Sequence, residues 1–143
     1  MANKINQKFV DIVRSTGGNN AYRHLLIAGY DTNIDKTCDD KFKMPTDTAE
    51  NGTTKLSISV HYYTPWDFCG DGGSGIYTQK DKEATETYFT KMDKFYNAGY
   101  GIIMGEFSVC NPKQEGVAQW LNDTMTIAAK HHILPVLWET NQH

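Results

Sequence analysis

The segment "GIIMGEFSVC", residues 101–110, places a carboxylate where a soluble protein normally avoids one. Apolar residues run from Ile102 to Met104, and Glu106 follows after a single glycine. A short apolar run of this kind predicts a strand that is buried on both faces. Burying a charge costs free energy unless the charge is paired or used. Glu106 at the end of this strand is therefore a candidate for chemistry.

Other residue types that can do chemistry follow three further apolar runs. His61 and Tyr63 close the run in "KLSISVHYY", and Trp138 closes the run in "ILPVLWE". The run in "HLLIAGY" continues into Asp31 and Asn33. Imidazole, hydroxyl, amide and carboxylate groups all exchange hydrogen bonds, and aromatic rings offer flat apolar faces. These groups form a polar and aromatic set that one binding site can share.

The elements that must position these residues alternate along the chain. Apolar periodicity predicts helices over residues 4–16, from Asp81 to about 96 and over 117–128, and strands over 24–30, 55–63, 102–107 and 133–139. The first helix is expected to pack through one face, made of Ile5, Phe9, Ile12, Val13 and Thr16. The polar stretch 31–54 is expected to hold at most a short turn near residues 39–44. Such alternation favours parallel βαβ units, whose functional groups gather beyond the carboxyl ends of the strands.

Three motifs, "SVHYYTPWDF", "GIIMGEFSV" and "ILPVLWETN", resemble in order and spacing the last three strands of glycoside hydrolase family five, and within it the endo-β-1,4-glucanases (cellulases). "AYRHLLIAGYDTNID" resembles the strand before them, so the resemblance covers nearly the whole chain. It implies an α/β fold that is half of a (β/α)8 TIM barrel, with strands five to eight and their flanking helices. Residues 1–143 would form this single partial domain.

The resemblance also implies roles for the residues singled out above. By the family's pattern Glu106 is the catalytic nucleophile, His61 and Tyr63 flank it, and Trp138 is the sugar platform at the cleavage subsite. Trp66 and Phe68 add flat faces for pyranose rings, while Asn33, Asp31 and Asp67 can bind sugar hydroxyls. The implied ligand is a β-glucan oligosaccharide, and no cofactor or metal is expected. Trp66 serves equally well as a loop anchor, and Trp120, on a helical apolar stripe, is expected in the core.

One expected part of the catalytic site has no counterpart in the sequence. A retaining glycosidase uses two carboxyl groups about 5–5.5 Å apart, one as nucleophile and one as acid and then base. The family's acid/base glutamate lies in an Asn-Glu motif after the fourth strand, and nothing here matches it. The isolated chain is therefore expected to have weak or no activity, with a homodimer or a missing N-terminal half-barrel completing it. The alternative function is a non-catalytic β-glucan-binding or scaffold half-barrel.

Composition narrows the remaining function classes. A net charge of −3 provides no basic field for nucleic acid, and no apolar run approaches the ~20 residues that a membrane helix needs. The first residues, "MANKINQKFV", lack the layout of a signal peptide, although the parent family is secreted. No glycine-rich phosphate loop follows the first strand, which argues against a flavodoxin-like domain. Cys38, Cys69 and Cys110 cannot all pair within one chain and do not form a CxxC zinc motif.

Overall fold

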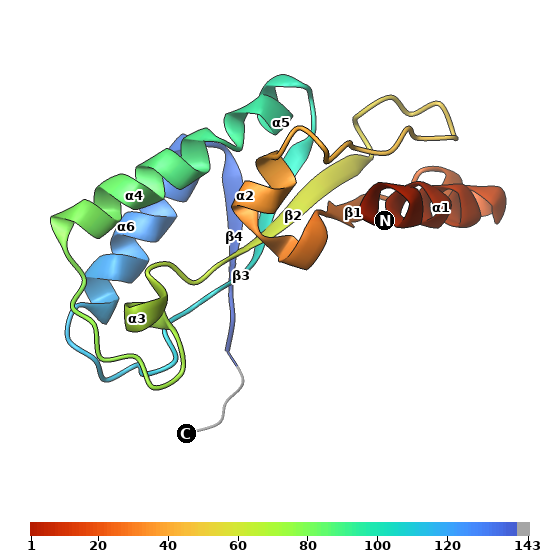
Figure 1. The fold of residues 1–143 in the computed structure, drawn as a ribbon. Coiled ribbons are helices and arrows are strands. Elements are labelled where there is room, and N and C mark those ends of the chain that lie inside the picture. The colour runs from red at the N-terminus through yellow and green to blue at the C-terminus, as the bar shows by residue number, and fades with distance from the viewer. Residues whose placement is uncertain (140–143) are drawn as a thin grey trace.

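The computed structural model describes residues 1–139 and forms one parallel sheet with helices beside it (Figure 1). The strands are β1 (Leu25–Ala28), β2 (Leu56–Tyr62), β3 (Gly101–Phe107) and β4 (Ile133–Leu137). The helices are α1 (Ala2–Ser15), α2 (Ile34–Cys38), α3 (Trp66–Cys69), α4 (Gln79–Thr90), α5 (Asp93–Asn97) and α6 (Val117–Lys130). The last two residues of the "ILPVLWETN" motif lie outside the described residues.

The sheet has the order β1-β2-β3-β4, and all three pairings are parallel. The expectation of four parallel strands with flanking helices is therefore confirmed. Because sequential neighbours pair throughout, β1 and β4 form the two edges of the sheet and have no second partner strand among residues 1–139. Such edges present unpaired backbone groups that can pair with another chain.

One face of the sheet carries the hydrophobic core. Helices α4 and α6 pack against each other on this face, and α6 also packs on β4 (Figure 1). Trp120 of α6 is fully buried, as expected, and lies between the rings of Tyr62 and Phe107, with centroids 6.4 and 6.0 Å away. Its indole N–H donates to the carbonyl of Thr64 at 2.9 Å, so the only polar atom of the ring is satisfied.

The opposite face of the sheet, which lines the interior of a closed barrel, is bare. Leu26 of β1 and Leu134 and Val136 of β4 are large apolar residues on this face, and Leu134 is 61% exposed. Interior residues of a closed (β/α)8 barrel are packed in layers of branched side chains. The exposed aliphatic residues therefore mark the surface that closure of a barrel would bury.

The expected packing face of α1 is wrong in most of its apolar residues, although Val13 packs against the core as expected. Ile5 and Ile12 are 59% and 54% exposed and Phe9 is exposed too, whereas Val10 and Arg14 are buried. The two sets lie on roughly opposite sides of a helix with 3.6 residues per turn. The reason is a competing polar attachment on the other side of α1.

That attachment joins α1 to the polar stretch 31–54. Arg14 forms two hydrogen bonds with the carboxylate of Asp47, at 2.9 and 2.8 Å, and both side chains are buried. Gln7 donates to the carbonyl of Thr46 and accepts from its N–H. These contacts orient the polar side of α1 toward the rest of the chain. The Ile5–Phe9–Ile12 stripe consequently faces outward.

Two other local expectations need correction. The helix expected from Asp81 to about 96 is two helices, α4 and α5, and it begins earlier: Thr78 is the N-cap, and its N–H and hydroxyl both donate to the Asp81 carboxylate. Helix α2 precedes the turn expected near residues 39–44. The side chain of Asn33 explains its position, because Oδ1 accepts from the N–H of Lys36 and so caps α2.

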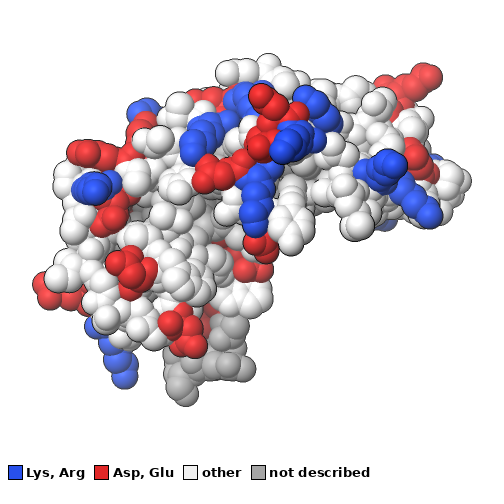
Figure 2. All heavy atoms as spheres, viewed as in Figure 1, with Lys and Arg blue, Asp and Glu red and all other residues white. Residues whose placement is uncertain are grey.

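The surface carries charges of both signs. Figure 2 shows acidic and basic side chains interspersed on one face of the molecule. Within residues 1–139, no helix combines the length and the apolar character required to cross a membrane.

Candidate active site

A β-bulge determines the direction of Glu106. The register between β2 and β3 runs Val60–Met104 and then His61–Glu106, so Gly105 is an extra residue in β3. The register between β3 and β4 shifts in the same segment, between Met104 and Phe107. Burial follows the bulge: Met104 and Phe107 are buried among the helices, three positions apart instead of two. Glu106 is thereby turned away from the helical core and kept partly exposed.

Gly105 fits this bulge because it has no side chain. A Cβ at this position would lie 3.2 Å from the hydroxyl of Ser59 and 3.7 Å from Nε2 of His61. The tight contact is the one with Ser59, whereas the distance to His61 is an ordinary van der Waals contact, so the glycine accommodates the Ser59 side chain of the neighbouring strand. Sequence reasoning missed the bulge, although an isolated glycine inside a strand pattern is the signal for one.

Glu106, Tyr63 and His61 form a contact cluster at the carboxyl ends of β2 and β3. The hydroxyl of Tyr63 donates to Oε2 of Glu106 at 3.1 Å, and Nδ1 of His61 lies 3.3 Å from the same oxygen. The side chains of His61 and Glu106 are 31% and 28% exposed, so the cluster is open to solvent on one side. The structure thus brings together the three residues expected to form the catalytic set.

The electrostatics of the cluster keep Tyr63 protonated. Burial raises the pKa of Tyr63 above its ordinary value, and the hydrogen bond to the Glu106 carboxylate raises that pKa further. At neutral pH Tyr63 is therefore a neutral phenol, and its hydroxyl can donate to an ionised carboxylate. Tyr63 can therefore hold the carboxylate in one orientation.

Trp138 lies next to this cluster at the end of β4. Its backbone N–H donates to the carbonyl of Phe107, the residue after Glu106, at 3.1 Å. Its side chain is 49% exposed, so Trp138 is not a core residue. Trp138 thus presents an exposed indole at the same edge of the sheet as Glu106, and its role as a sugar platform stays a prediction.

The loop after β2 separates the two aromatic candidates that it carries. Trp66 is exposed at the start of α3, whereas Phe68 is 1% exposed and packs in the core. The expectation that Phe68 contacts a sugar is therefore wrong, because its ring faces Tyr77 inside the molecule. Asp67 is exposed, and its carbonyl accepts from the N–H of Gly75, which closes the loop.

Asp31 and Asn33 follow β1 but are engaged in local contacts. Asp31 forms an exposed ion pair with Lys36 at 3.3 Å, and the Oδ1 of Asn33 caps α2. Among the described residues, neither forms a hydrogen bond with the Glu106 cluster. The backbone is strained here, because Asp31 and Thr32 both have positive φ, at 62° and 47°. A structural role is established for Asn33, and a ligand role for either residue remains a proposal.

Within residues 1–139, no group of three or more His, Cys, Asp or Glu side chains is arranged to hold a metal ion. The contact cluster at the ends of β2 and β3 contains one carboxylate, one phenol and one imidazole.

Comparison with known proteins places these features in a family. The family model for cellulases of glycosyl hydrolase family 5 matches residues 1–143. Endoglucanase A of Paenibacillus barcinonensis is 36% identical over 96% of this chain, which spans 41% of that protein.

Solved structures agree with the sequence match. A family 5 xyloglucanase from Paenibacillus pabuli superposes with a TM-score of 0.87 at 32% identity, over 99% of this chain and 47% of that one. A GH5-4 broad-specificity endoglucanase from an uncultured bovine rumen ciliate gives a TM-score of 0.86 at 33% identity, over 99% and 45% of the two chains. The chain therefore spans less than half the length of these relatives.

Proposed function

The chain belongs to glycosyl hydrolase family 5, and we propose that it supplies the nucleophile half of a retaining endo-β-1,4-glucanase active site. The observation that carries this proposal is the convergence of Tyr63 and His61 on one oxygen of Glu106. Because both partners contact Oε2, we assign Oε1 as the oxygen that attacks the anomeric carbon. Members of this family are glycosidases, and the catalytic role of Glu106 in this chain is our proposal.

In the proposed reaction, Glu106 forms a covalent glycosyl ester and displaces the leaving group from the opposite face of the sugar. Tyr63 and His61 hold the carboxylate plane, so that the attacking oxygen is positioned before substrate binds. During attack the negative charge of Glu106 is consumed as the ester forms. Water then attacks the same anomeric carbon and gives its proton to the acid/base group supplied by the partner half, while the ester C–O bond breaks and releases the Glu106 carboxylate to its hydrogen bond with Tyr63.

Substrate binding is assigned to the exposed groups around this cluster. Trp138 would stack on the sugar ring at the cleavage point, and Trp66 would contact a neighbouring unit of the β-glucan chain. Asp31 and Asn33 would bind sugar hydroxyls, with Asn33 using the part of its amide that does not cap α2. Support comes from the exposure of both indoles and from the neighbouring family members, one of which is a xyloglucanase in complex with ligand.

The acid/base group must come from outside the described chain. Its carboxyl oxygens would have to lie about 5–5.5 Å from those of Glu106 to give retention. A second half-barrel can bring such a group if it pairs with the open edges of β1 and β4. A second copy of this chain or a complementary N-terminal half of the family barrel is the proposed partner, and only the complementary half carries the family's Asn-Glu acid.

The Ile5–Phe9–Ile12 stripe supports closure by such a partner. Helix α1 precedes the edge strand β1 in the same way that α6 precedes β4. In a barrel with right-handed connections, α1 therefore lies on the outer face, near the place where a partner strand would pair with β1. A partner half that pairs with β1 would also bring its own helices beside α1, and these would bury the stripe. Closure of the whole barrel would cover Leu26 of β1 and Leu134 of β4 on the inner face, which are otherwise exposed.

A non-catalytic β-glucan-binding half-barrel is the second candidate function. The exposed aromatic residues Trp66 and Trp138 favour it, because they can bind sugar rings without any acid group. Both candidate functions predict β-glucan binding, so only a measurement of hydrolysis or of covalent glycosylation separates them.

Hydrolysis of two substrate types tests the proposal. The chain alone should act poorly on unactivated β-1,4-glucan, and an aryl cellobioside with an acidic phenol should be affected less, because its leaving group needs little protonation. Both activities should vanish in Glu106→Gln. Adding the N-terminal half-barrel of a family 5 relative should restore glucan hydrolysis. Strong glucan hydrolysis by the chain alone would contradict the missing acid, and activity retained in Glu106→Gln would contradict the nucleophile.

A further inference from the structure

Two of the three cysteines are held next to each other beside the candidate site. Cys69 is the last residue of α3, and Cys110 lies in the segment after β3. The backbone N–H of Cys110 donates to the carbonyl of Cys69 at 2.9 Å. Standard bond lengths then limit their Cα separation to about 7 Å at most, and disulfides span Cα distances of about 4.4–6.8 Å.

The loops that carry these cysteines are packed together at a second point. The side-chain amide of Gln114, in the segment after β3, donates to the carbonyl of Gly75, in the loop after α3, at 2.7 Å. One hydrogen bond therefore joins the loops at the cysteines, and a second joins them six residues after Cys69 and four residues after Cys110. The backbone separation of the two cysteines thus falls within the range that a disulfide can span.

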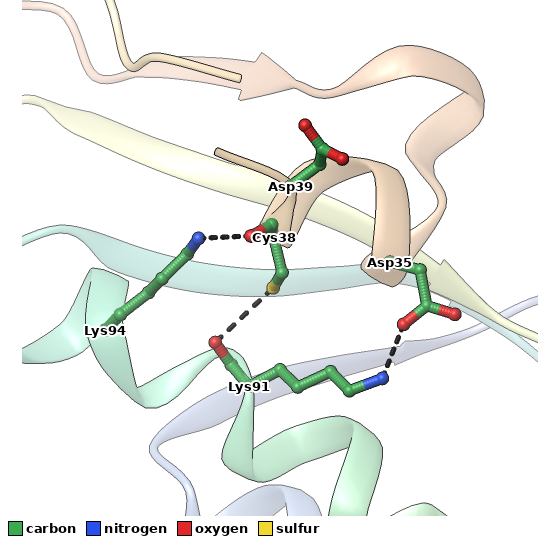
Figure 3. A pocket seen from close by; sticks show the side chains of 5 residues that line it. All are labelled: Asp35, Cys38, Asp39, Lys91 and Lys94. Carbon is green, nitrogen blue, oxygen red and sulfur yellow. Dashed lines mark hydrogen bonds and ion pairs between the residues drawn. The ribbon is translucent and has the colours of Figure 1, made fainter. Parts of the chain in front are cut away.

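The third cysteine has different surroundings. Cys38 lines a pocket of about 410 Å³ with Asp35, Asp39, Lys91 and Lys94 (Figure 3). Its thiol donates to the carbonyl of Lys91 at 3.4 Å, and its own carbonyl accepts from Lys94 at 2.6 Å (Figure 3). Cys38 therefore serves as an internal control for the reactivity of the other two.

We propose that Cys69 and Cys110 are a modification site: they form an intramolecular disulfide when the folded chain meets a low-molecular-weight disulfide such as oxidised glutathione. Cys110, which is exposed, loses its proton and attacks one glutathione sulfur, which releases the first reduced glutathione. Cys69 then loses its proton and attacks the sulfur of Cys110, which releases the second. Two protein thiols are oxidised to one disulfide, and one oxidised glutathione is reduced to two thiols.

The order of these steps follows from burial. Cys69 is fully buried, and burial raises the pKa of its thiol to about 12. A buried, protonated thiol reacts poorly with a dissolved oxidant, whereas an exposed one is accessible. The first attack is therefore assigned to Cys110, and the second step is slow but intramolecular.

The position of the bond gives it a consequence for the candidate site. Cys69 lies six residues after Tyr63, and Cys110 lies four residues after Glu106. The disulfide would connect the two loops that continue from the strands bearing this hydrogen-bonded pair. It would fix the loop that presents Trp66 relative to β3, independently of whether the proposed catalytic function holds.

Tryptic peptide mapping under non-reducing conditions tests the proposal, because each cysteine lies in a different peptide: residues 37–41, 56–80 and 95–113. The folded chain is incubated with oxidised glutathione, free thiols are alkylated, and the digest is compared before and after reduction. We expect peptides 56–80 and 95–113 to appear as one linked species that reduction separates. Peptide 37–41 should be found unlinked, with Cys38 alkylated.

Two variants complete the test. Cys38→Ser should give the same linked species, and Cys110→Ser, a change at an exposed position, should abolish it without affecting folding. The oxidised protein should also show a higher Tm than the reduced protein, a difference absent from Cys110→Ser. A stable glutathione adduct on Cys110 without linkage to Cys69, or linkage that involves Cys38, would overturn the proposal.

Discussion

The hydroxyl of Tyr63 lies 3.1 Å from Oε2 of Glu106, across the joint between β2 and β3. This hydrogen bond connects a residue just after β2 with a residue of β3, and Glu106 directly follows the extra residue Gly105 of the bulge. The geometry gives Glu106 a fixed orientation at the open end of the sheet. It is the structural basis of the proposed nucleophile and of the first prediction.

Tyr63→Phe should lower kcat for an aryl cellobioside by about 10- to 100-fold and change KM much less. A hydrogen bond to a charged group contributes about 1.5–3 kcal/mol, and this one orients the attacking group. The matched control is Tyr77→Phe, which removes the hydrogen bond from a tyrosine to Asp123 far along the chain. Equal rate losses in the two variants would indicate a general structural effect.

Trp138→Ala should weaken binding of a cello-oligosaccharide while it leaves the free energy of unfolding nearly unchanged. Half of the side chain is already exposed, so little core packing is lost. Trp120→Ala, the control in the core, should destabilise the protein by about 3–5 kcal/mol. Calorimetric titration and urea unfolding measure the two quantities. Unchanged binding with a large stability loss in Trp138→Ala would reverse its assignment.

Asp47→Asn should destabilise the chain by about 3–5 kcal/mol at pH 7, because it leaves Arg14 buried without its charged partner. The Arg14 guanidinium lowers the pKa of Asp47 from 3.8 to about 2. Because the pKa of Asp47 is lower in the folded state, the ionised carboxylate stabilises the fold at any pH above its ordinary pKa of 3.8. This stabilisation is lost as the pH falls from about 4 to 2.

Urea unfolding between pH 2 and 7 checks this prediction. The free energy of unfolding of the wild-type chain should fall below about pH 4. In Asp47→Asn this fall should be smaller, because the variant has no carboxylate at this position to protonate. Asp31→Asn is the control, because its ion pair with Lys36 is exposed and should be worth less than about 1 kcal/mol. Parallel pH profiles for wild type and Asp47→Asn would show that this pair does not determine acid stability.

Val136→Lys should dissociate or precipitate the protein if β4 pairs with a partner half-barrel. Val136 is exposed on the edge strand β4, where a closed barrel would bury it. Ile76→Lys, at a more exposed apolar residue in a loop, is the matched control and should leave the oligomeric state unchanged. Sedimentation at micromolar concentration, where we expect a homodimer, measures the effect. A compact monomer for wild type would rule out self-pairing.

Much of this fold could be predicted from local sequence. Each strand is a short apolar run beside a helical pattern, and such alternation leaves few topologies open. The contact of Tyr63 and His61 with Glu106 was also expected, since parallel strands bring their carboxyl ends to one edge. The roles of Trp138, Trp66, Asp31 and Asn33 toward a ligand stay predictions.

The errors have one physical cause, which is that tertiary contacts override local pattern. The stripe of Ile5, Phe9 and Ile12 has the period of a packed face, yet the buried pair of Arg14 and Asp47 turns it outward. Periodicity cannot reveal a partner 33 residues away. Phe68 was misplaced for the same reason: a loop aromatic can face either solvent or core, and only the path of the loop decides.

The central claim is that Glu106 is the nucleophile, and covalent trapping tests it most directly. A 2-fluoro-cellobioside with an activated leaving group needs no acid, so the chain can be tested alone and with the N-terminal half-barrel of a relative. After digestion, the account predicts a glycosyl mass increment on peptide 95–113, in which Glu106 is the only carboxylate side chain, and no increment in Glu106→Gln. Labelling of any other peptide, or none in the reconstituted protein, would contradict the account.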